Sequence, residues 1–330
     1  MSDARMYTLH SYGMFQQKPH TARRRGGASA HCVFKTRVVY YPHMIDLHTH
    51  STASDGSLTP SQLITEARAI GLSAIALTDH DTIDGLDEAR SEATRLGIRF
   101  ISGIEFAIHW EPGEFHLLGL GLHMPDAAFS ASIARLAHTR EKRNKEIVRR
   151  INEELNLYIV YEDVVQQSGG HSVGRPHFAK ILIQHKIVKN MKQAFDRYLG
   201  KGRPFYAPKE NPAFQDAARL IKAAGGIAVL AHPMSLYVAW GRLPALLASL
   251  KEQGLDGIEA WHPTAKLGHC KRLEALGHKL GLFITAGSDF HGEFRRERKL
   301  GRTAGGKKIE DAVLEAIPPL SGAWNGTHCV

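Results

Sequence analysis

The sequence contains little cysteine. Its three cysteines, Cys32, Cys270 and Cys329, lie far apart in a chain of 330 residues and form no CxxC pair. Disulfide frameworks and thiolate metal sites need several suitably spaced cysteines, so we expect neither of them here. This excludes a small disulfide-stabilised domain and a zinc finger.

Long apolar runs are also missing. No segment approaches the roughly 20 apolar residues that span a bilayer. Residues 1–43 contain no apolar stretch of the length that a secretory signal needs. We therefore expect a cytoplasmic protein without a membrane partner, and nothing in the sequence indicates a stable protein partner.

Acidic residues are almost absent from the first 43 positions. This segment holds seven Lys or Arg residues and one acid, Asp3, so it carries +6 of the formal net charge of +9. A basic, polar segment without hydrophobic periodicity is typical of disorder. Arg23, Arg24 and Arg25 could form a nucleic-acid-binding arm, but we favour a solvated extension. The charge of the whole chain therefore says little about the surface of the folded part.

From residue 44 onward, strand-like apolar runs alternate with segments of helical composition. We expect helices at 61–70, 86–96, 243–253 and 265–280, and strands at 73–78, 98–106, 226–231, 256–260 and 282–286. This β-α alternation predicts an α/β fold, with a parallel barrel or a related closed sheet. Active sites of such folds collect at the carboxyl ends of the strands.

A central segment interrupts the alternation. Residues 125–225 contain a long charged helix at 132–155 and further helical segments at 162–167, 176–184 and 192–199. We interpret this segment as a helical insertion that caps the barrel mouth. The barrel then comprises residues 44–124 and 226–318, and residues 319–330 form a tail.

Six strand-like apolar runs carry a histidine or a carboxylate at or near their ends: 44–50, 75–80, 100–105, 114–119, 227–232 and 283–291. Histidines two positions apart on an extended segment point the same way, so His48 and His50 can bind one ion together. A single histidine such as His116 is more often structural, but a series of such groups at successive strand ends predicts a site for several metal ions. The candidate ligands are His48, His50, Asp55, His80, Glu105, His116, His232, Asp289 and His291. We interpret the histidines without this placement as structural: His109, His123, His171, His262 and His269.

The motifs that carry these ligands have a recognisable order and spacing. They resemble the polymerase-and-histidinol-phosphatase (PHP) family, in particular its 3′,5′-nucleoside bisphosphate phosphatases and 5′→3′ exoribonucleases. The resemblance covers roughly residues 44–300 and rests on HTHSTASDGSLTP, LTDHDTIDG, GIEF, FHLLG, GRPHFAK, AHP and GSDFH.

This resemblance implies a distorted (β/α)7 barrel and a trinuclear site, usually with manganese. One ion would be held by His48, His50, Glu105 and Asp289. Glu105 would bridge to a second ion on His116 and His232, and a third would bind Asp55, His80 and His291. The donor atoms alone leave manganese, zinc and iron open.

The charge of such a site favours a phosphate ester as substrate. Three divalent ions, three carboxylates and a bridging hydroxide would leave the site near +2, which suits a phosphate dianion. The hydroxide, held by the ion on His48, His50, Glu105 and Asp289, would be the nucleophile. The expected reaction is removal of the 3′-phosphate from nucleoside 3′,5′-bisphosphates such as pAp.

Other functions stay open. The main alternative is 5′→3′ degradation of short 5′-phosphorylated RNA. A histidinol-phosphate phosphatase is a weaker alternative, as is a non-catalytic, metal-stabilised RNA-binding protein. An intact ligand set argues against a purely structural metal site.

The cap contains the strongest candidate for substrate binding. Gly174-Arg175-Pro176-His177 predicts a helix start, and the planar guanidinium of Arg175 matches phosphate oxygens. A salt bridge between cap and barrel is the alternative for Arg175, but the family resemblance implies a phosphate contact by both Arg175 and His177. Aromatic residues of the cap could stack on bases: Phe178, Phe205 or Tyr206.

Overall fold

The computed structural model describes residues 44–123, 126–168, 173–208 and 211–321. The expected basic extension at 1–43, most of the expected tail at 319–330 and His171 lie outside the described residues.

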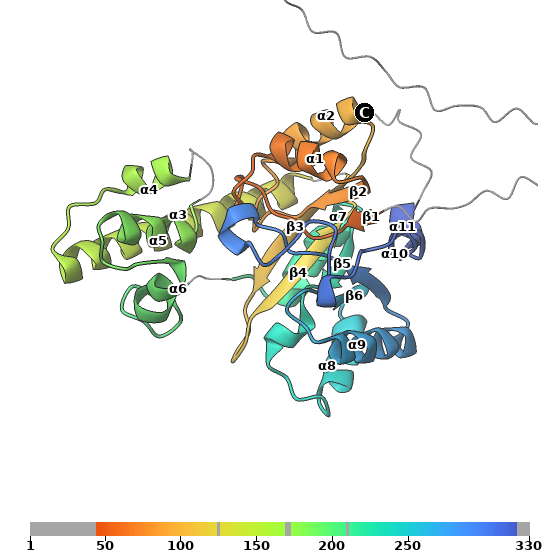
Figure 1. Cartoon of the computed structure of the whole chain (residues 1–330). Helices are drawn as coiled ribbons and strands as arrows, with labels where there is room; N and C mark the ends of the chain where they lie inside the picture. The colour runs from red at the N-terminus through yellow and green to blue at the C-terminus, as the bar shows by residue number, and fades with distance from the viewer. Residues whose placement is uncertain (1–43, 124–125, 169–172, 209–210, 322–330) are drawn as a thin grey trace, which may run out of the picture. The chain divides into compact units, whose positions relative to one another are not determined.

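Seven strands form the sheet, and their order in the sheet is their order in the chain (Figure 1). β1, β2 and β3 are parallel, and so are β5, β6 and β7. The predicted α/β class is confirmed. The strands are β1 (Met44–Asp46), β2 (Leu72–Leu77), β3 (Arg99–Ile108), β4 (Phe115–Leu120), β5 (Ile227–Leu230), β6 (Gly257–Trp261) and β7 (Phe283–Ala286).

The strand β4 departs from the expected parallel pattern, because it runs antiparallel to both β3 and β5. Residues 109–114 connect β3 to β4, and so short a segment cannot return the chain for parallel pairing, which takes a dozen or more residues. The amino end of β4 therefore lies beside the carboxyl ends of its neighbours. His116, the second residue of β4, reaches the same edge of the sheet as the other candidate ligands.

The first and last strands meet only beyond their ends. β1 and β7 are not paired in the strand order, but Thr49 and Phe290 form an isolated parallel bridge. His50 N–H donates to the Phe290 carbonyl at 2.9 Å, and Asp289 N–H donates to the His48 carbonyl at 2.9 Å. The two edges of the sheet are thus tied together at the place where ligands from both ends of the chain converge.

Helices pack against the outside of the sheet, and local signals define their ends. Thr59 and Gln62 form a capping box at the start of α1. Left-handed Gly97 and Gly281 end α2 and α9. These helices are α1 (Pro60–Ala69), α2 (Leu86–Leu96), α7 (Phe214–Ala223), α8 (Leu243–Glu252), α9 (Leu267–Leu280), α10 (Ala312–Glu315) and α11 (Pro318–Ser321).

Four of these helices lie within two residues of their predicted bounds, whereas α7 was not predicted. Its sequence, FQDAARLIKA, is amphipathic, and its apolar face is buried against β3, β4 and β5. No helix in the described part of the chain is both long and apolar enough to cross a bilayer.

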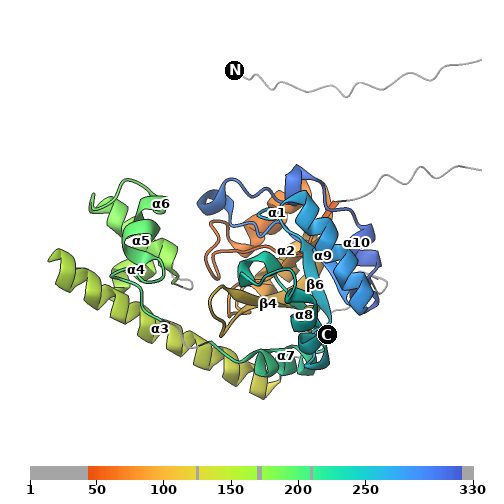
Figure 2. The same cartoon turned by 90° about the horizontal axis from the view of Figure 1, so that it is seen from below.

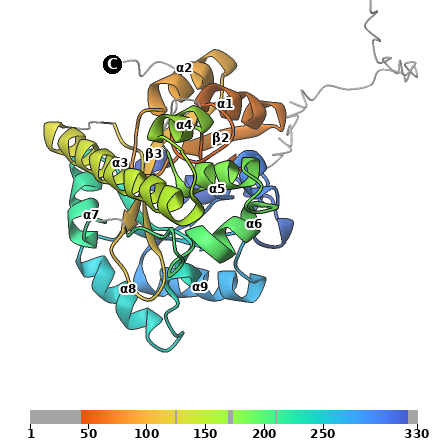
Figure 3. The ribbon, with the colours of Figure 1, turned by 90° about the vertical axis from the view of Figure 1, so that its left-hand side faces the viewer.

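The central segment forms a group of helices on one side of the sheet (Figures 2 and 3). Phe178, Leu182 and Phe205 are fully buried in a core whose described members all lie between Ile147 and Ala207. The elements are α3 (Ala127–Leu155), α4 (Tyr161–Gln167), α5 (Arg175–Gln184), α6 (Met191–Ala194) and a π-helix, η1 (Phe195–Leu199).

The two ends of the central segment pack differently. We call the sheet and the helices packed on it the barrel. Its core includes Phe129 and Ile133 from the start of α3, and Phe214 and Ile221 from α7. We therefore propose that the cap with a core of its own spans 147–207, inside the 125–225 expected from sequence, and we call 147–207 the cap.

This separate core predicts that the cap can be weakened alone. Phe178→Ala should cost about 3–5 kcal/mol, because it leaves a cavity in a fully buried position. Limited proteolysis of the variant should cut first within 147–207, while fragments containing 44–123 and 211–321 persist. Equally early cutting in the barrel would show that the two parts unfold together.

Candidate metal centre

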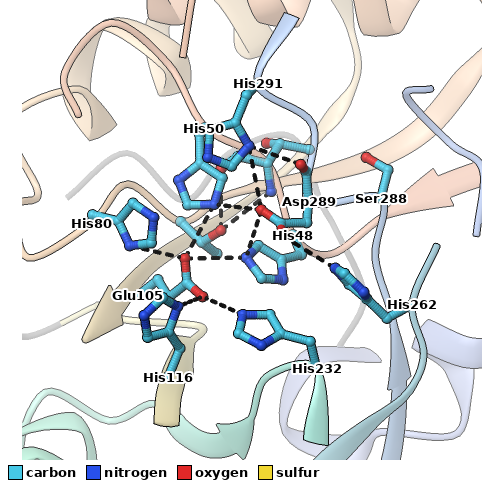
Figure 4. Close-up of polar contacts among 12 residues, drawn as sticks. His48, His50, His80, Glu105, His116, His232, His262, Ser288, Asp289 and His291 are labelled. Carbon is cyan, nitrogen blue, oxygen red and sulfur yellow. Dashed lines mark hydrogen bonds and ion pairs between the residues drawn. The ribbon is translucent and has the colours of Figure 1, made fainter. Parts of the chain in front are cut away.

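A buried carboxylate, Glu105 on β3, lies at the centre of the candidate site. Its side chain is fully buried, and five histidine rings surround it (Figure 4). The rings come from the ends of β1, β2 and β5 and from β4, so four strands other than β3 position them. Oε2 lies 3.3 Å from His48 Nε2, 3.2 Å from His50 Nε2 and 3.1 Å from His80 Nδ1, and Oε1 lies 2.9 Å from His116 Nδ1 and 3.1 Å from His232 Nε2.

Two further carboxylates extend the cluster. Asp289, in the loop after β7, places Oδ1 3.2 Å from His50 Nε2 and 3.3 Å from His291 Nδ1. Asp55, in the turn after β1, places Oδ1 3.2 Å from His291 Nε2 and 3.8 Å from His80 Nε2. The three carboxylates therefore lie among shared histidines, as a cluster of ions requires.

Eight of the nine expected ligands fall into three groups whose donor atoms lie within 4.8 Å of one another. His50, Glu105 and His80 each belong to two groups. His232 is the ninth and touches the cluster through Glu105. The groups are His48, His50, Glu105 and Asp289; His50, Asp55, His80 and His291; and His80, Glu105 and His116.

Several donor atoms in this cluster have no hydrogen-bond partner among the described residues. They are buried, and they include His48 Nε2, both ring nitrogens of His50, Glu105 Oε2 and His291 Nε2. Leaving buried polar atoms unpaired is costly. Nitrogen and carboxylate oxygen donors that point toward one another fit divalent cations such as manganese, iron or zinc.

The electrostatics of the cluster show strong coupling. Burial alone would raise the pKa of Glu105, but His80 and His48 hold this pKa well below its usual range. Burial opposes a charge on His50, yet Asp289 and Glu105 raise its pKa to about 9. For His80 burial prevails over Glu105 and Asp55, and its pKa falls to about 3. The Glu105 carboxylate is thus ionised and needs positive charge nearby.

The strand β6 supplies two residues that sequence reasoning missed. Glu259 is 1% exposed; its Oε1 lies 3.0 Å from His48 Nδ1, and its Oε2 accepts a hydrogen bond from the His232 N–H at 2.8 Å. His262, interpreted above as structural, places Nε2 3.2 Å from Asp289 Oδ2. A signal was present for Glu259, because Gly257-Ile258-Glu259 repeats the Gly-Ile-Glu that contains Glu105.

Other histidines have different surroundings. His123 Nδ1 lies 2.8 Å from the Gly121 carbonyl, and His269 packs against Trp240. His109, by contrast, lines the cavity described next.

Two candidate ligands have backbone conformations that side chains rarely adopt. His232 has φ 28°, and Asp289 has φ 51°. Such residues cost on the order of 1–3 kcal/mol each and persist where the surroundings hold them. Here the His232 N–H is bonded to Glu259 and the Asp289 N–H to the His48 carbonyl. The strain therefore lies at the candidate metal centre.

A cavity of about 550 Å³ opens between the centre and the cap. From the centre it is lined by Asp55, His80 and His116, and from the cap and α3 by Arg140, Arg143 and Arg175, among other residues. No carboxylate oxygen of a described residue lies within 4.0 Å of the Arg143 or Arg175 guanidinium nitrogens. The bridge from α3 to the barrel is made instead by Arg140, which bonds Asp81 Oδ2 and the His80 carbonyl at 2.7 Å each.

The two predicted phosphate contacts differ in placement. Arg175 lines the cavity, and its guanidinium carbon lies 5.8 Å from the ring centre of Phe195 and 5.9 Å from that of Tyr206. His177 is 3% exposed and is not among the lining residues; its Nδ1 accepts the Gly174 N–H at 2.9 Å at the start of α5. Its phosphate contact stays a prediction.

The expectation for base stacking needs a correction. Phe178 and Phe205 are fully buried in the core of the cap, so they cannot stack on a base. Tyr206 is the member of the expected set that lines the cavity.

Comparison with known proteins gives consistent matches. The model of the PHP domain matches residues 46–203. A 5′-3′ exoribonuclease of Haemophilus influenzae is 36% identical over 246 residues, which cover 74% of this chain and 89% of that protein. A 3′,5′-nucleoside bisphosphate phosphatase of Chromobacterium violaceum is 32% identical over 277 residues, which cover 84% of this chain and 93% of that protein.

Solved structures agree with the sequence matches. An amidohydrolase from Chromobacterium violaceum, with bound sulfate and no metal, has a TM-score of 0.72 and 30% identity over 83% of this chain and 96% of that chain. A protein described as a metal-dependent phosphoesterase, from Bifidobacterium adolescentis, has a TM-score of 0.73 and 29% identity over 84% and 98%.

The unpaired donor atoms around Glu105 predict that divalent cations stabilise the fold. Adding Mn²⁺ to metal-stripped protein at about 100 times its Kd should contribute about 2.7 kcal/mol, or a rise in Tm of roughly 5–10 °C. Glu105→Gln should lose most of this rise, because an amide NH2 replaces one cation-binding oxygen. Differential scanning fluorimetry measures both.

Glu92→Gln on the helix α2 is the matched control, since Glu92 pairs only with Arg95 and Thr65 among the contacts described for it. This variant should keep the full rise in Tm. An undiminished rise in Glu105→Gln would place the cations elsewhere.

Proposed function

The chain belongs to the PHP domain family, and on that basis we propose that it is a metal-dependent phosphoesterase that removes the 3′-phosphate from nucleoside 3′,5′-bisphosphates such as pAp. The observation that supports this substrate class most directly is the cavity, which joins the candidate metal centre to Arg143 and Arg175, two arginines without a carboxylate partner among the described residues. The bisphosphate phosphatase relative supplies the specific reaction.

We infer three divalent ions in the centre, with manganese favoured and zinc or iron as alternatives. Bound ions of this kind lower the pKa of water and neutralise charge on a phosphoryl group. His48, His50, Glu105 and Asp289 would hold the first ion. The second would bind Glu105, His116 and His232, and the third Asp55, His80 and His291.

The residues around the centre fit this cation load. The donors contributed by His48, His50 and Glu105 point inward, and several of them are buried without a hydrogen-bond partner in the part of the chain that the structure describes. Behind them, Glu259 adds one buried negative charge, and Arg298, which pairs with Asp289, adds one buried positive charge. These two roughly cancel, so the positive surplus expected from three ions and three carboxylates remains available to a phosphate dianion.

The arginines of the cavity fit a second phosphate. Arg143 donates to the Asn144 side-chain oxygen at 2.8 and 3.2 Å, and burial together with Arg140 and Arg175 lowers its pKa to about 9. Cations held close together without a carboxylate partner favour an anion between them. A guanidinium also matches phosphate oxygens in a planar fork. We infer that Arg143 and Arg175 bind the phosphate that is not hydrolysed.

The size of the cavity favours a mononucleotide. Its volume of about 550 Å³ lies inside the range of roughly 300–1,000 Å³ that is usual for small-molecule sites. Trp110 and Tyr206 are among its lining residues and offer aromatic surface to a base. The proposed order is therefore the metal centre for one phosphate, Arg143 of α3 and Arg175 of the cap for the other, and aromatic surface for the nucleoside.

Degradation of short 5′-phosphorylated RNA is the second candidate. The relative from Haemophilus influenzae, a 5′-3′ exoribonuclease, supports it. Both reactions hydrolyse a phosphate ester beside a second phosphate group, so the same centre and the same arginines would serve either one.

A direct comparison of substrates tests the proposal. Protein reconstituted with Mn²⁺ should release phosphate from pAp with a kcat/KM at least about tenfold above its kcat/KM for a 5′-phosphorylated oligoribonucleotide, because the cavity has the size of a small-molecule site. EDTA should abolish both activities. A higher kcat/KM for the oligonucleotide would favour the exoribonuclease instead.

The arginine subsite makes a separate prediction. Arg143→Ala should raise KM for pAp by about 10- to 100-fold, since a charge-assisted contact contributes about 1.5–3 kcal/mol. The KM for 3′-AMP, which has no second phosphate, should change little. Steady-state kinetics with both substrates measures the difference.

Arg135→Ala on the same helix is the control, because Arg135 is exposed and bonds Ser132. It should leave both KM values unchanged. An equal rise of both KM values in Arg143→Ala would mean that Arg143 does not recognise the second phosphate.

A further inference from the structure

Strand β6 carries none of the expected metal ligands. It nevertheless places a buried carboxylate, Glu259, in contact with two of these ligands. The side chain of Glu259 has no exposed surface and contacts His48 from β1 and His232 from β5. Glu259 belongs to none of the three groups of donor atoms that could hold an ion. It therefore touches the ligands from the side that faces away from the candidate ions.

The contact with His48 determines which ring nitrogen faces the ions. Glu259 Oε1 lies 3.0 Å from His48 Nδ1, so an ionised Glu259 accepts the Nδ1–H. Nε2 then keeps its lone pair, 3.3 Å from Glu105 Oε2 and 3.6 Å from Asp289 Oδ1. A carboxylate on the far nitrogen fixes both the tautomer and the orientation of a metal-binding histidine.

The second oxygen of Glu259 acts on the backbone. Oε2 accepts the His232 N–H at 2.8 Å, at a residue with φ 28° and ψ 65°. This strained conformation aims the His232 ring at Glu105, with Nε2 3.1 Å from Oε1. The hydrogen bond thus holds a backbone that would relax more readily without it.

Gly287 gives independent support for the contact between Glu259 and His48. A Cβ at position 287 would lie 2.2 Å from His48 Cβ and 2.6 Å from Glu259 Oε1. Such distances are impossible without displacing one of the two residues. The close approach of Glu259 to His48 therefore depends on a glycine in the neighbouring loop.

We propose that Glu259 is a positioning residue that orients His48 and His232 for two of the three ions. This inference rests on the proposed function, because it assumes that His48 and His232 bind metal. The ion expected on Asp55, His80 and His291 should not depend on Glu259, since Glu259 has no described contact with any of the three.

Glu259→Gln tests the proposal. The amide keeps the size of the side chain, but its NH2 cannot accept a hydrogen bond and its remaining oxygen carries no charge, so one of the two contacts is lost and the other is weakened. Binding of two Mn²⁺ ions should weaken by about 10- to 100-fold, whereas the third keeps its wild-type affinity. Metal content, measured by mass spectrometry after dialysis at a series of buffered free Mn²⁺ concentrations, resolves the two classes.

Glu259→Asp separates charge from position, and it also serves if the glutamine variant folds poorly. It keeps the charge but is one methylene too short to hold both partners, so the same two ions should weaken. Asp256→Asn is the matched control, because Asp256 directly precedes β6 and accepts the Ala228 N–H of β5 at 2.8 Å. This control should bind all three ions as the wild type does.

Three results would overturn the proposal. Wild-type affinity for all three ions in Glu259→Gln or in Glu259→Asp would show that positioning by Glu259 is not needed. Equal weakening of all three ions would indicate general damage instead of selective positioning. Wild-type protein that binds no divalent ion would refute the metal centre itself, and with it both this inference and the proposed function.

Discussion

The structure depends on one buried carboxylate. Glu105 has no exposed surface and lies within 3.3 Å of five imidazole rings. A carboxylate in such a place is stable only if positive charge compensates it. The histidines provide part of this positive charge, and several of their ring nitrogens have no hydrogen-bond partner among the described residues, so they could also bind a cation. The strands flanking β3 must end at one level for five rings to reach the same group, so the sheet geometry and the charge requirement are linked.

The cap adds a second requirement, which concerns recognition instead of chemistry. Its core between Ile147 and Ala207 is separate from the core of the barrel. Arg140 ties the helix α3 to the barrel through Asp81 and the His80 carbonyl, whereas Arg143 and Arg175 face the cavity without a carboxylate partner in the described chain. In the proposed function, the barrel would hold the ions, and Arg143 of α3 together with Arg175 of the cap would bind a second phosphate. Because the cap has a core of its own, the cap residues that line the cavity can change without disturbing the candidate metal ligands.

A layer of buried groups supports the ligands from behind. Glu259 contacts His48 and His232, while Arg298 and His262 contact Asp289. Opposite charges on Glu259 and Arg298 add little net charge to the centre. Their effect is on orientation, at the positions where the backbone of His232 and Asp289 is strained. Such a layer explains how nine side chains from distant segments can keep one arrangement.

The sequence alone determined the α/β class, most of the helices and strands, and the candidate ligands. These follow from local patterns: a period of two or 3.6 residues, helix caps, and polar groups where apolar runs end. Eight of the nine predicted ligands fall into common donor groups for this reason.

Non-local contacts decided the features that sequence reasoning missed. Glu259 meets His48 across 211 positions of sequence, and Phe178 and Phe205 turned inward because the cap closes around them. The pairing of β4 with β5 joins segments on either side of the cap, and the difference between Arg175 and His177 depends on which side of α5 faces the cavity. Tertiary packing alone sets such contacts, because it brings together groups whose separation along the chain carries no information about their distance in space.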